Sequence, residues 1–210
     1  MNKHIIYLAA GNSRRFGSNK LLHIYGGKPL YRHGLDMLTG LCRNRPDCSL
    51  MVVSQYPEIL EYAGREGIFT VYSPDSSKGM SYTIKAAVGA LENAKEEDFL
   101  LFVVADQPYL TAHTVTRILE CAAPGVEGVS AAFRERSGNP VLFSARLIPA
   151  LLSLRGDEGG RRALRGHSCT YVAVEDEREL YDIDTPENQY LCSGGDVAGD
   201  NEPASTSNII

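Results

Sequence analysis

Two kinds of hydrophobic pattern alternate along the chain. Short, nearly continuous apolar runs are typical of buried strands, and longer segments with apolar residues every three to four positions are typical of helices. The run at 99–105 is the strongest strand signal, and at 111–122 Thr111 stands where a helix cap is expected. The expected strands are 4–10, 49–53, 69–72, 99–105, 129–133, 141–143 and 170–174, and the expected helices are 29–38, 59–66, 81–93, 111–122 and 145–152.

This alternation predicts an α/β domain with a largely parallel sheet. In such sheets ligands gather at the carboxyl ends of the strands. Gly11 follows the first expected strand, and Asp106 follows the strand at 99–105. We therefore expect both residues to face one crevice.

Length and composition fit a single globular domain with a substantial core. The chain has 210 residues, of which 43% are hydrophobic, and its net charge is only −5. Nothing in this balance indicates a nucleic-acid or membrane-surface partner. Residues 193–210 contain few large apolar groups before the last two, so we expect a domain over 1–192 followed by a flexible tail over 193–210.

The cysteines and the N-terminal segment indicate a reducing, cytoplasmic setting. Five widely spaced cysteines without a C-x-x-C pair predict free thiols rather than a disulfide framework or a zinc knuckle. The apolar run at 4–8 is too short for a signal peptide or a membrane span.

The loop over residues 8–20 is rich in candidate anion-binding groups. Gly11 allows a sharp turn that presents backbone N–H groups, and Arg14, Arg15 and Lys20 add positive charge suited to several phosphate oxygens. The spacing matches neither the G-x-x-x-x-G-K-[ST] phosphate loop nor the G-x-G-x-x-G dinucleotide fingerprint. From the residues alone, an ordinary basic surface loop explains this segment equally well.

Three aspartates are candidates for metal binding. Asp106 stands after a hydrophobic strand and before Pro108, a position suited to a Mg²⁺ shared with phosphates. Its alternative role is to cap the following turn. Residue alternation would place Asp182 and Asp184 on one face, although capping of a final helix would account for one of them.

Other segments carry weaker signals. Residues 73–81 precede a helix and could close over a base and ribose, or could form a plain capped loop. The five histidines form no H-x-x-x-H or H-E-x-x-H pattern, and Ser13 and Ser81 lack a G-x-S-x-G setting. A zinc site and a serine hydrolase triad are therefore not expected.

Taken in order, several motifs resemble those of the MobA-like nucleotidyltransferases, and within that family the chain is most similar to the molybdenum cofactor cytidylyltransferases. Ala10 stands where the guanylyl branch usually has Gly, while Tyr82 and Asn188 depart from the pattern. The matching segments are Leu8-Ala9-Ala10-Gly11-x-Ser13-x-Arg15-x-Gly17-x-x-Lys20, Gly27-Lys28-Pro29-Leu30, Pro74-Asp75 with Gly79-Met80-Ser81, Asp106-Gln107-Pro108, Gly138 to Phe143, Gly156-Asp157-x-Gly159-x-Arg161, and Asp182 to Glu187.

The resemblance implies a Rossmann-like three-layer α/β/α domain of the nucleotide-diphospho-sugar transferase type. It also implies transfer of CMP from CTP to the terminal phosphate of molybdenum-molybdopterin, with Mg²⁺ as cofactor, pyrophosphate as second product and a molybdenum hydroxylase as client. Arg15, Lys20 and Asp106 would be catalytic, and Asp106 and Asp184 would hold the metal. The nucleotide would contact Leu8, Ala9, Ala10, Gly11, Ser13, Arg15, Lys20, Asp75, Gly79 and Ser81, and the acceptor Asn139, Asp157, Arg161 and Asp182.

Other functions fit the same residues. The scaffold could transfer a guanylyl or another nucleotidyl group to a phosphorylated metabolite, or could act as a non-catalytic carrier of molybdenum cofactor. A nicotinamide oxidoreductase is disfavoured because its glycine fingerprint is missing.

Overall fold

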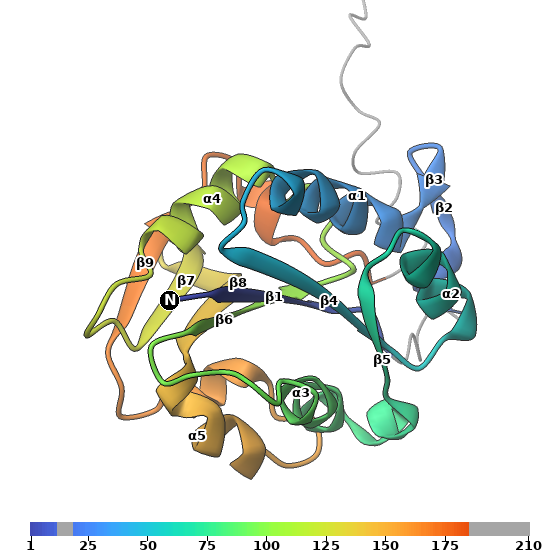
Figure 1. Cartoon of the computed structure of the whole chain (residues 1–210). Helices are drawn as coiled ribbons and strands as arrows, with labels where there is room; N and C mark the ends of the chain where they lie inside the picture. The colour runs from blue at the N-terminus through green and yellow to red at the C-terminus, as the bar shows by residue number, and fades with distance from the viewer. Residues whose placement is uncertain (12–18, 185–210) are drawn as a thin grey trace, which may run out of the picture.

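The computed structural model describes residues 1–11 and 19–184, which form a three-layer α/β/α arrangement (Figure 1). The expected tail over 193–210 lies outside the described residues. The strands are β1 (Lys3–Leu8), β2 (Ile24–Tyr25), β3 (Lys28–Pro29), β4 (Cys48–Ser54), β5 (Phe69–Tyr72), β6 (Phe99–Val104), β7 (Gly128–Phe133), β8 (Arg136–Ser144) and β9 (Cys169–Ala173). The helices are α1 (Leu30–Arg43), α2 (Pro57–Arg65), α3 (Met80–Gly89), α4 (Ala112–Glu120) and α5 (Ile148–Ser153).

The central sheet has seven strands in the order β5-β4-β1-β6-β8-β7-β9. β1 pairs in parallel with β4 and with β6, so the segments that follow β1 and β6 leave the sheet side by side. β8 is the exception, since it runs antiparallel to both β6 and β7. The expectation of a largely parallel α/β sheet is confirmed, with β8 as the reversed strand.

Two hydrophobic layers enclose the sheet, because alternate side chains of each central strand point to opposite faces. In β1, Ile5 and Tyr7 pack on the side of α1, α2 and α4, whereas Ile6 and Leu8 pack on the side of α3 and α5. The runs at 4–10 and 99–105 lack a polar face for this reason.

Most expected elements occur within a few residues of their positions, with some differences. Thr111 caps α4 by accepting a hydrogen bond from the backbone N–H of Thr114. The helix expected at 81–93 ends at Gly89, and the one expected at 145–152 begins as a 3-10 turn at Ala145–Leu147 before α5. The β2–β3 hairpin was not predicted, because two-residue strands carry no readable alternation.

No helix in the described part of the chain is both long enough and apolar enough to cross a membrane.

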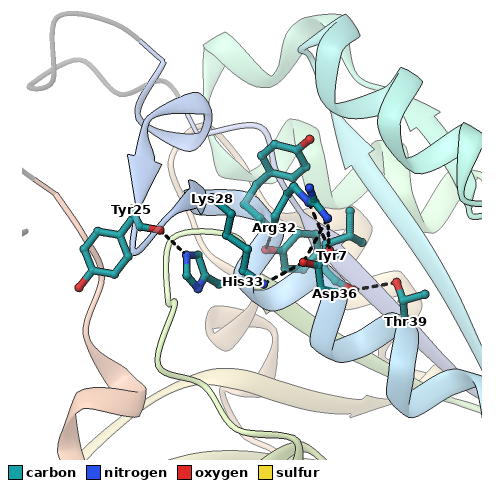
Figure 2. Close-up of polar contacts among 9 residues, drawn as sticks. Tyr7, Tyr25, Lys28, Arg32, His33, Asp36 and Thr39 are labelled. Carbon is teal, nitrogen blue, oxygen red and sulfur yellow. Dashed lines mark hydrogen bonds and ion pairs between the residues drawn. The ribbon is translucent and has the colours of Figure 1, made fainter.

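A buried contact between β1 and α1 fixes the helix against the sheet (Figure 2). The Tyr7 hydroxyl donates to the carbonyl oxygen of Tyr31 at 2.6 Å. Gly34 faces this ring, and a Cβ at that position would lie 2.7 Å from Tyr7 Oη and 2.9 Å from a ring carbon. The helix can therefore approach the strand only because residue 34 has no side chain.

Gly34→Ala is expected to destabilise the fold by about 1–3 kcal/mol, the usual effect of overpacking a core. The matched control is Gly40→Ala in the same helix, where a Cβ meets nothing within 4 Å. There the change should stabilise by up to about 1 kcal/mol, because alanine has the higher helix propensity. Thermal unfolding of both variants tests this contact, and equal melting temperatures would contradict it.

Candidate active site

A cavity of about 490 Å³ opens at the carboxyl ends of β1 and β6. This size lies within the usual range for small-molecule sites. Gly11 and Asp106 both line it, as their positions after two neighbouring parallel strands predict. Among residues 1–11 and 19–184, the lining is Leu8, Ala10, Gly11, Lys20, Leu21, Ser76, Gly79, Met80, Thr83, Val104, Ala105, Asp106, Asp157 and Asp184.

Side chains at the carboxyl end of β4 hold the first part of the 8–20 loop by its carbonyl groups. Ser54 donates to the carbonyl of Ala9 at 2.6 Å, and Gln55 Nε2 donates to that of Ala10 at 2.7 Å. The C=O and N–H of a trans peptide point in opposite directions. The N–H groups of Ala10 and Gly11 are therefore turned away from Ser54 and Gln55, and both residues line the cavity. Backbone N–H groups held in this way suit an anion.

Lys20 forms ion pairs with two carboxylates that line the cavity. Its Nζ donates to Asp106 Oδ2 at 2.8 Å and to Asp184 Oδ1 at 3.0 Å. Burial alone would lower the pKa of Lys20, but the charge of Asp106 and the hydrogen bonds to both carboxylates outweigh it and raise that pKa. Lys20 is therefore a cation held beside two anions.

A backbone contact brings the late acidic segment to this place. The N–H of Ile183 donates to the carbonyl of Asp106 at 2.9 Å. Asp184 then reaches Lys20, whereas Asp182 accepts a hydrogen bond from Gln107 Nε2 at 2.9 Å. Burial and the nearby Asp106 carboxylate raise the pKa of Asp182 to about 6. The two aspartates thus have different partners and different surroundings.

At another part of the large cavity, the loop before α3 and the loop that contains Gly156 are in direct backbone contact. Gly79 precedes α3 with a φ of +137°, and a Cβ there would lie 2.3 Å from the carbonyl oxygen of Gly156. The N–H of Ser81 donates to that same oxygen at 3.1 Å. This contact sets the position of Asp157, the next residue, which lines the cavity.

A smaller cavity of about 130 Å³ adjoins the first and shares Leu8, Met80 and Val104 with it. Its floor is apolar, and Asn139 and Arg161 contribute its polar lining. Arg161 is oriented by two bonds to Ser137, one to the carbonyl and one to the hydroxyl oxygen, both at 2.6 Å. The site therefore has a large polar compartment and a smaller, mainly apolar one.

The structure brings most of the expected site residues to these two cavities, but not all of them. Leu8, Ala10, Gly11, Lys20, Gly79, Asp106, Asp157 and Asp184 line the large cavity, and Asn139 and Arg161 line the small one. Ser13 and Arg15 lie outside the described residues.

Four expected residues line neither cavity. Ala9 and Ser81 are fully buried. Asp75 is exposed and pairs with Lys78 at 2.7 Å, and Asp182 lies behind Asp106, against Gln107. The expected nucleotide contacts of Asp75 and Ser81 stay predictions.

Some lining residues were not anticipated from the sequence. Ser76 and Thr83 face the cavity and are linked by a hydrogen bond from the Thr83 hydroxyl to Ser76 Oγ at 2.7 Å. The signal that could have indicated them is the segment 73–81, which was expected to close over a base and ribose: Ser76 lies within it and Thr83 follows it in α3. The other unanticipated members are Leu21, Met80, Val104 and Ala105.

The oxygens of Asp106 and Asp184 are of the type that Mg²⁺ and Mn²⁺ prefer. Within residues 1–11 and 19–184, no group of three or more His, Cys, Asp or Glu residues could hold a metal alone. Two carboxylates fit a Mg²⁺ that completes its coordination with water and substrate phosphates, the usual arrangement in phosphoryl-transfer sites.

The sequence model of the MobA-like NTP transferase domain matches residues 5–172. Purine catabolism protein PucB of Bacillus subtilis is 32% identical over 198 residues, which cover 87% of this chain and 91% of PucB. Nicotine blue oxidoreductase of Paenarthrobacter nicotinovorans is 30% identical over 197 residues, covering 88% of this chain and 93% of that protein.

Solved structures share the fold. Rv0371c from Mycobacterium tuberculosis H37Rv superposes with a TM-score of 0.75 at 22% identity, covering 91% of this chain and 96% of that one. The same protein has been solved in complex with manganese, with a TM-score of 0.70. At these identities the likeness establishes the fold alone.

Proposed function

The chain belongs to the MobA-like NTP transferase family and is a nucleotidyltransferase, and on this premise we propose that it transfers CMP from CTP to the terminal phosphate of a molybdenum-molybdopterin acceptor. The observation that carries the proposal is the cluster of Lys20, Asp106 and Asp184 in a cavity walled by the backbone of Ala10 and Gly11. This arrangement combines anion-binding N–H groups, a lysine and two carboxylates suited to a metal.

The reaction makes few demands on protein side chains. An oxygen of the acceptor phosphate attacks the α-phosphorus of CTP, the bond from that phosphorus to the bridging oxygen breaks, and pyrophosphate leaves. The nucleophile is already an anion, so alignment and charge stabilisation supply the catalysis. Ala10, Gly11 and Lys20 would bind the triphosphate, and Arg15 and Ser13 are proposed to assist from the same loop.

Asp106 and Asp184 would hold Mg²⁺, which when bound supplies positive charge to the α-phosphate and the departing pyrophosphate. The manganese complex of the structural relative Rv0371c supports a divalent cation in this fold. Gly79 would lie beside the nucleotide, with Asp75 and Ser81 holding the loop around it. Asp157, Asn139 and Arg161 would face the acceptor, with Asp182 supporting Asp106.

Cytidine specificity rests on Ala10. This residue lines the cavity and stands where the guanylyl branch usually has glycine. The test is pyrophosphate release by the purified chain with Mg²⁺, molybdenum-molybdopterin and each of the four nucleoside triphosphates. We expect release with CTP; release with GTP but not CTP would exclude the cytidylyl assignment.

The name of one relative, nicotine blue oxidoreductase, makes reduction the alternative activity to test. An absorbance assay that follows NADH and NADPH oxidation by the same protein, with nicotine blue supplied as the electron acceptor, separates the two reactions. Oxidation of either cofactor without pyrophosphate release would favour the oxidoreductase. A carrier without catalysis would deliver cofactor to a hydroxylase yet release no pyrophosphate with any nucleotide.

Arg161→Met is expected to raise KM for the acceptor about tenfold, because it removes a charge-assisted hydrogen-bond donor from the small cavity. KM for CTP should stay within about twofold. The matched control is Arg162→Met. Arg162 is paired with Glu158 at 2.7 Å and lines neither cavity. Steady-state kinetics with each substrate varied separately tests the assignment, which fails if both variants change the same constant equally.

A further inference from the structure

The ammonium group of Lys20 occupies the position between Asp106 and Asp184. It lies 2.8 Å from Oδ2 of Asp106 and 3.0 Å from Oδ1 of Asp184. The Lys20 side chain is only 8% exposed and that of Asp106 23%, so the contact between these two is largely shielded from water. Two carboxylates from distant parts of the chain are thus held together by a cation that belongs to the protein.

A divalent cation held by Asp106 and Asp184 would bind the same two carboxylates that the Lys20 ammonium group contacts. A metal held by both carboxylates would lie between them. That position overlaps the place of the Lys20 nitrogen, and two positive charges so close repel strongly in a shielded site. Lys20 and a bridging metal therefore exclude each other from this pair.

We propose that Lys20 and the divalent cation are alternative occupants of the Asp106–Asp184 pair, and that triphosphate binding draws the ammonium group onto phosphate and opens the pair to the metal. The inference rests on the proposed function, which supplies the triphosphate. Metal alone then binds weakly, and metal and nucleotide strengthen each other's binding by the same factor, as linkage requires.

The surroundings of Lys20 allow this movement without unfolding the site. Its backbone begins a 3-10 turn at Lys20–Leu22, which Asn19 caps by accepting a bond from the N–H of Leu21 at 3.1 Å. The lysine side chain is a flexible chain of four carbons, and Lys20 lines the cavity that would bind the triphosphate. The side chain of Asp184 is 53% exposed, against 23% for Asp106, so the bond to Asp184 is the one more weakened by solvent.

The test is Mn²⁺ binding to the full chain without nucleotide, measured by electron paramagnetic resonance and calorimetry. Lys20→Met should bind Mn²⁺ about tenfold or more tightly than the unmodified chain, because the competing charge is gone. The matched control is Lys28→Met, which removes a lysine paired with Asp36 at the same 2.8 Å, beside α1 and away from the cavity (Figure 2). Its Mn²⁺ affinity should be unchanged.

Two further variants of the same experiment separate the effect of the Lys20 charge on Mn²⁺ binding from the effect of its side-chain packing. Lys20→Arg keeps the positive charge and should retain weak Mn²⁺ binding, while Lys20→Gln should tighten it as methionine does. Adding CTP should strengthen Mn²⁺ binding to the unmodified chain more than to Lys20→Met, with the CTP–Mn²⁺ equilibrium measured in parallel without protein. Circular dichroism and thermal melting establish that each variant is folded.

A folded Lys20→Met or Lys20→Gln chain that binds Mn²⁺ no more tightly than the unmodified chain overturns the inference. Pyrophosphate release by the unmodified chain is scored independently. Tighter Mn²⁺ binding by the variants without any nucleotidyl transfer by the unmodified chain supports the shared site and sinks the proposed function. Nucleotidyl transfer by the unmodified chain, together with unchanged Mn²⁺ affinity in the Lys20 variants, supports the proposed function and overturns the shared site.

Discussion

Replacing Asp106 by asparagine is expected to lower kcat for nucleotidyl transfer by two to three orders of magnitude, on the order of the losses seen when one group that stabilises transition-state charge is removed. Asparagine keeps the shape of the side chain but removes the charge that holds Lys20 at 2.8 Å and would hold the metal. The defect should therefore appear in kcat and kcat/KM together, because the lost interaction acts mainly in the transition state. Pyrophosphate release at saturating CTP and Mg²⁺ measures it.

The control for this prediction is Asp36→Asn. Asp36 also accepts from a lysine at 2.8 Å, and from Arg32, but it lies on α1 outside the cavity (Figure 2). We expect kcat within about twofold of the unmodified chain and a small loss of stability, as for other half-exposed ion pairs. If Asp106→Asn retained full turnover, while delivery of cofactor to a hydroxylase failed, the carrier role would replace the catalytic one.

The middle of the sheet could be predicted from the sequence because strands such as β1 and β6 are buried on both faces. Such strands form continuous apolar runs, and the run that becomes β6 is clear in isolation. The reversed direction of β8 could not be predicted, since an apolar run carries no information about which neighbour it joins or in which sense. It is set by the tertiary pairing of β8 with β6 and β7, not by local pattern.

The candidate site was partly predictable for a related reason. Gly11 and Asp106 follow parallel neighbours, so the topology alone places both at one edge of the sheet. The contact of Lys20 with Asp184 joins residues 164 positions apart, and nothing local in the sequence indicates it. The pairing of Asp75 with Lys78 at the surface was likewise not indicated by the motif that contains Asp75, and its expected nucleotide contact stays a prediction.

Gly79→Ala is expected to disrupt the site more than any other substitution of a residue without functional groups. Gly79 has a φ of +137°, where side chains are strained, and its new Cβ would lie 2.3 Å from the Gly156 carbonyl oxygen and 2.8 Å from the Asp157 nitrogen. Both neighbours are backbone atoms, so no side-chain rotation can relieve the collision. Either the loop that carries Asp157 or the start of α3 must move.

Such a displacement should cost about 1–3 kcal/mol in backbone strain. It should also lower kcat/KM about a hundredfold, because a shift of about 1 Å in groups that position substrate has effects of this size. The control is Gly67→Ala, which also has a positive φ, +74°, but meets nothing within 4 Å. Gly67→Ala carries the strain of a positive φ without a collision, so comparing the two variants separates these two effects.

Gly79→Ala should therefore lose at least as much stability as Gly67→Ala, because the collision adds to the strain of the backbone angle, and only Gly79→Ala should lose activity. Thermal unfolding with and without CTP, together with kinetics for both substrates, distinguishes the outcomes. If Gly67→Ala lost activity to the same degree, general destabilisation would explain both variants. If Gly79→Ala kept full activity, the close approach of the two loops would have no part in shaping the site. Because the large and the small cavity share Met80, the residue after Gly79, we expect KM for both substrates to rise together.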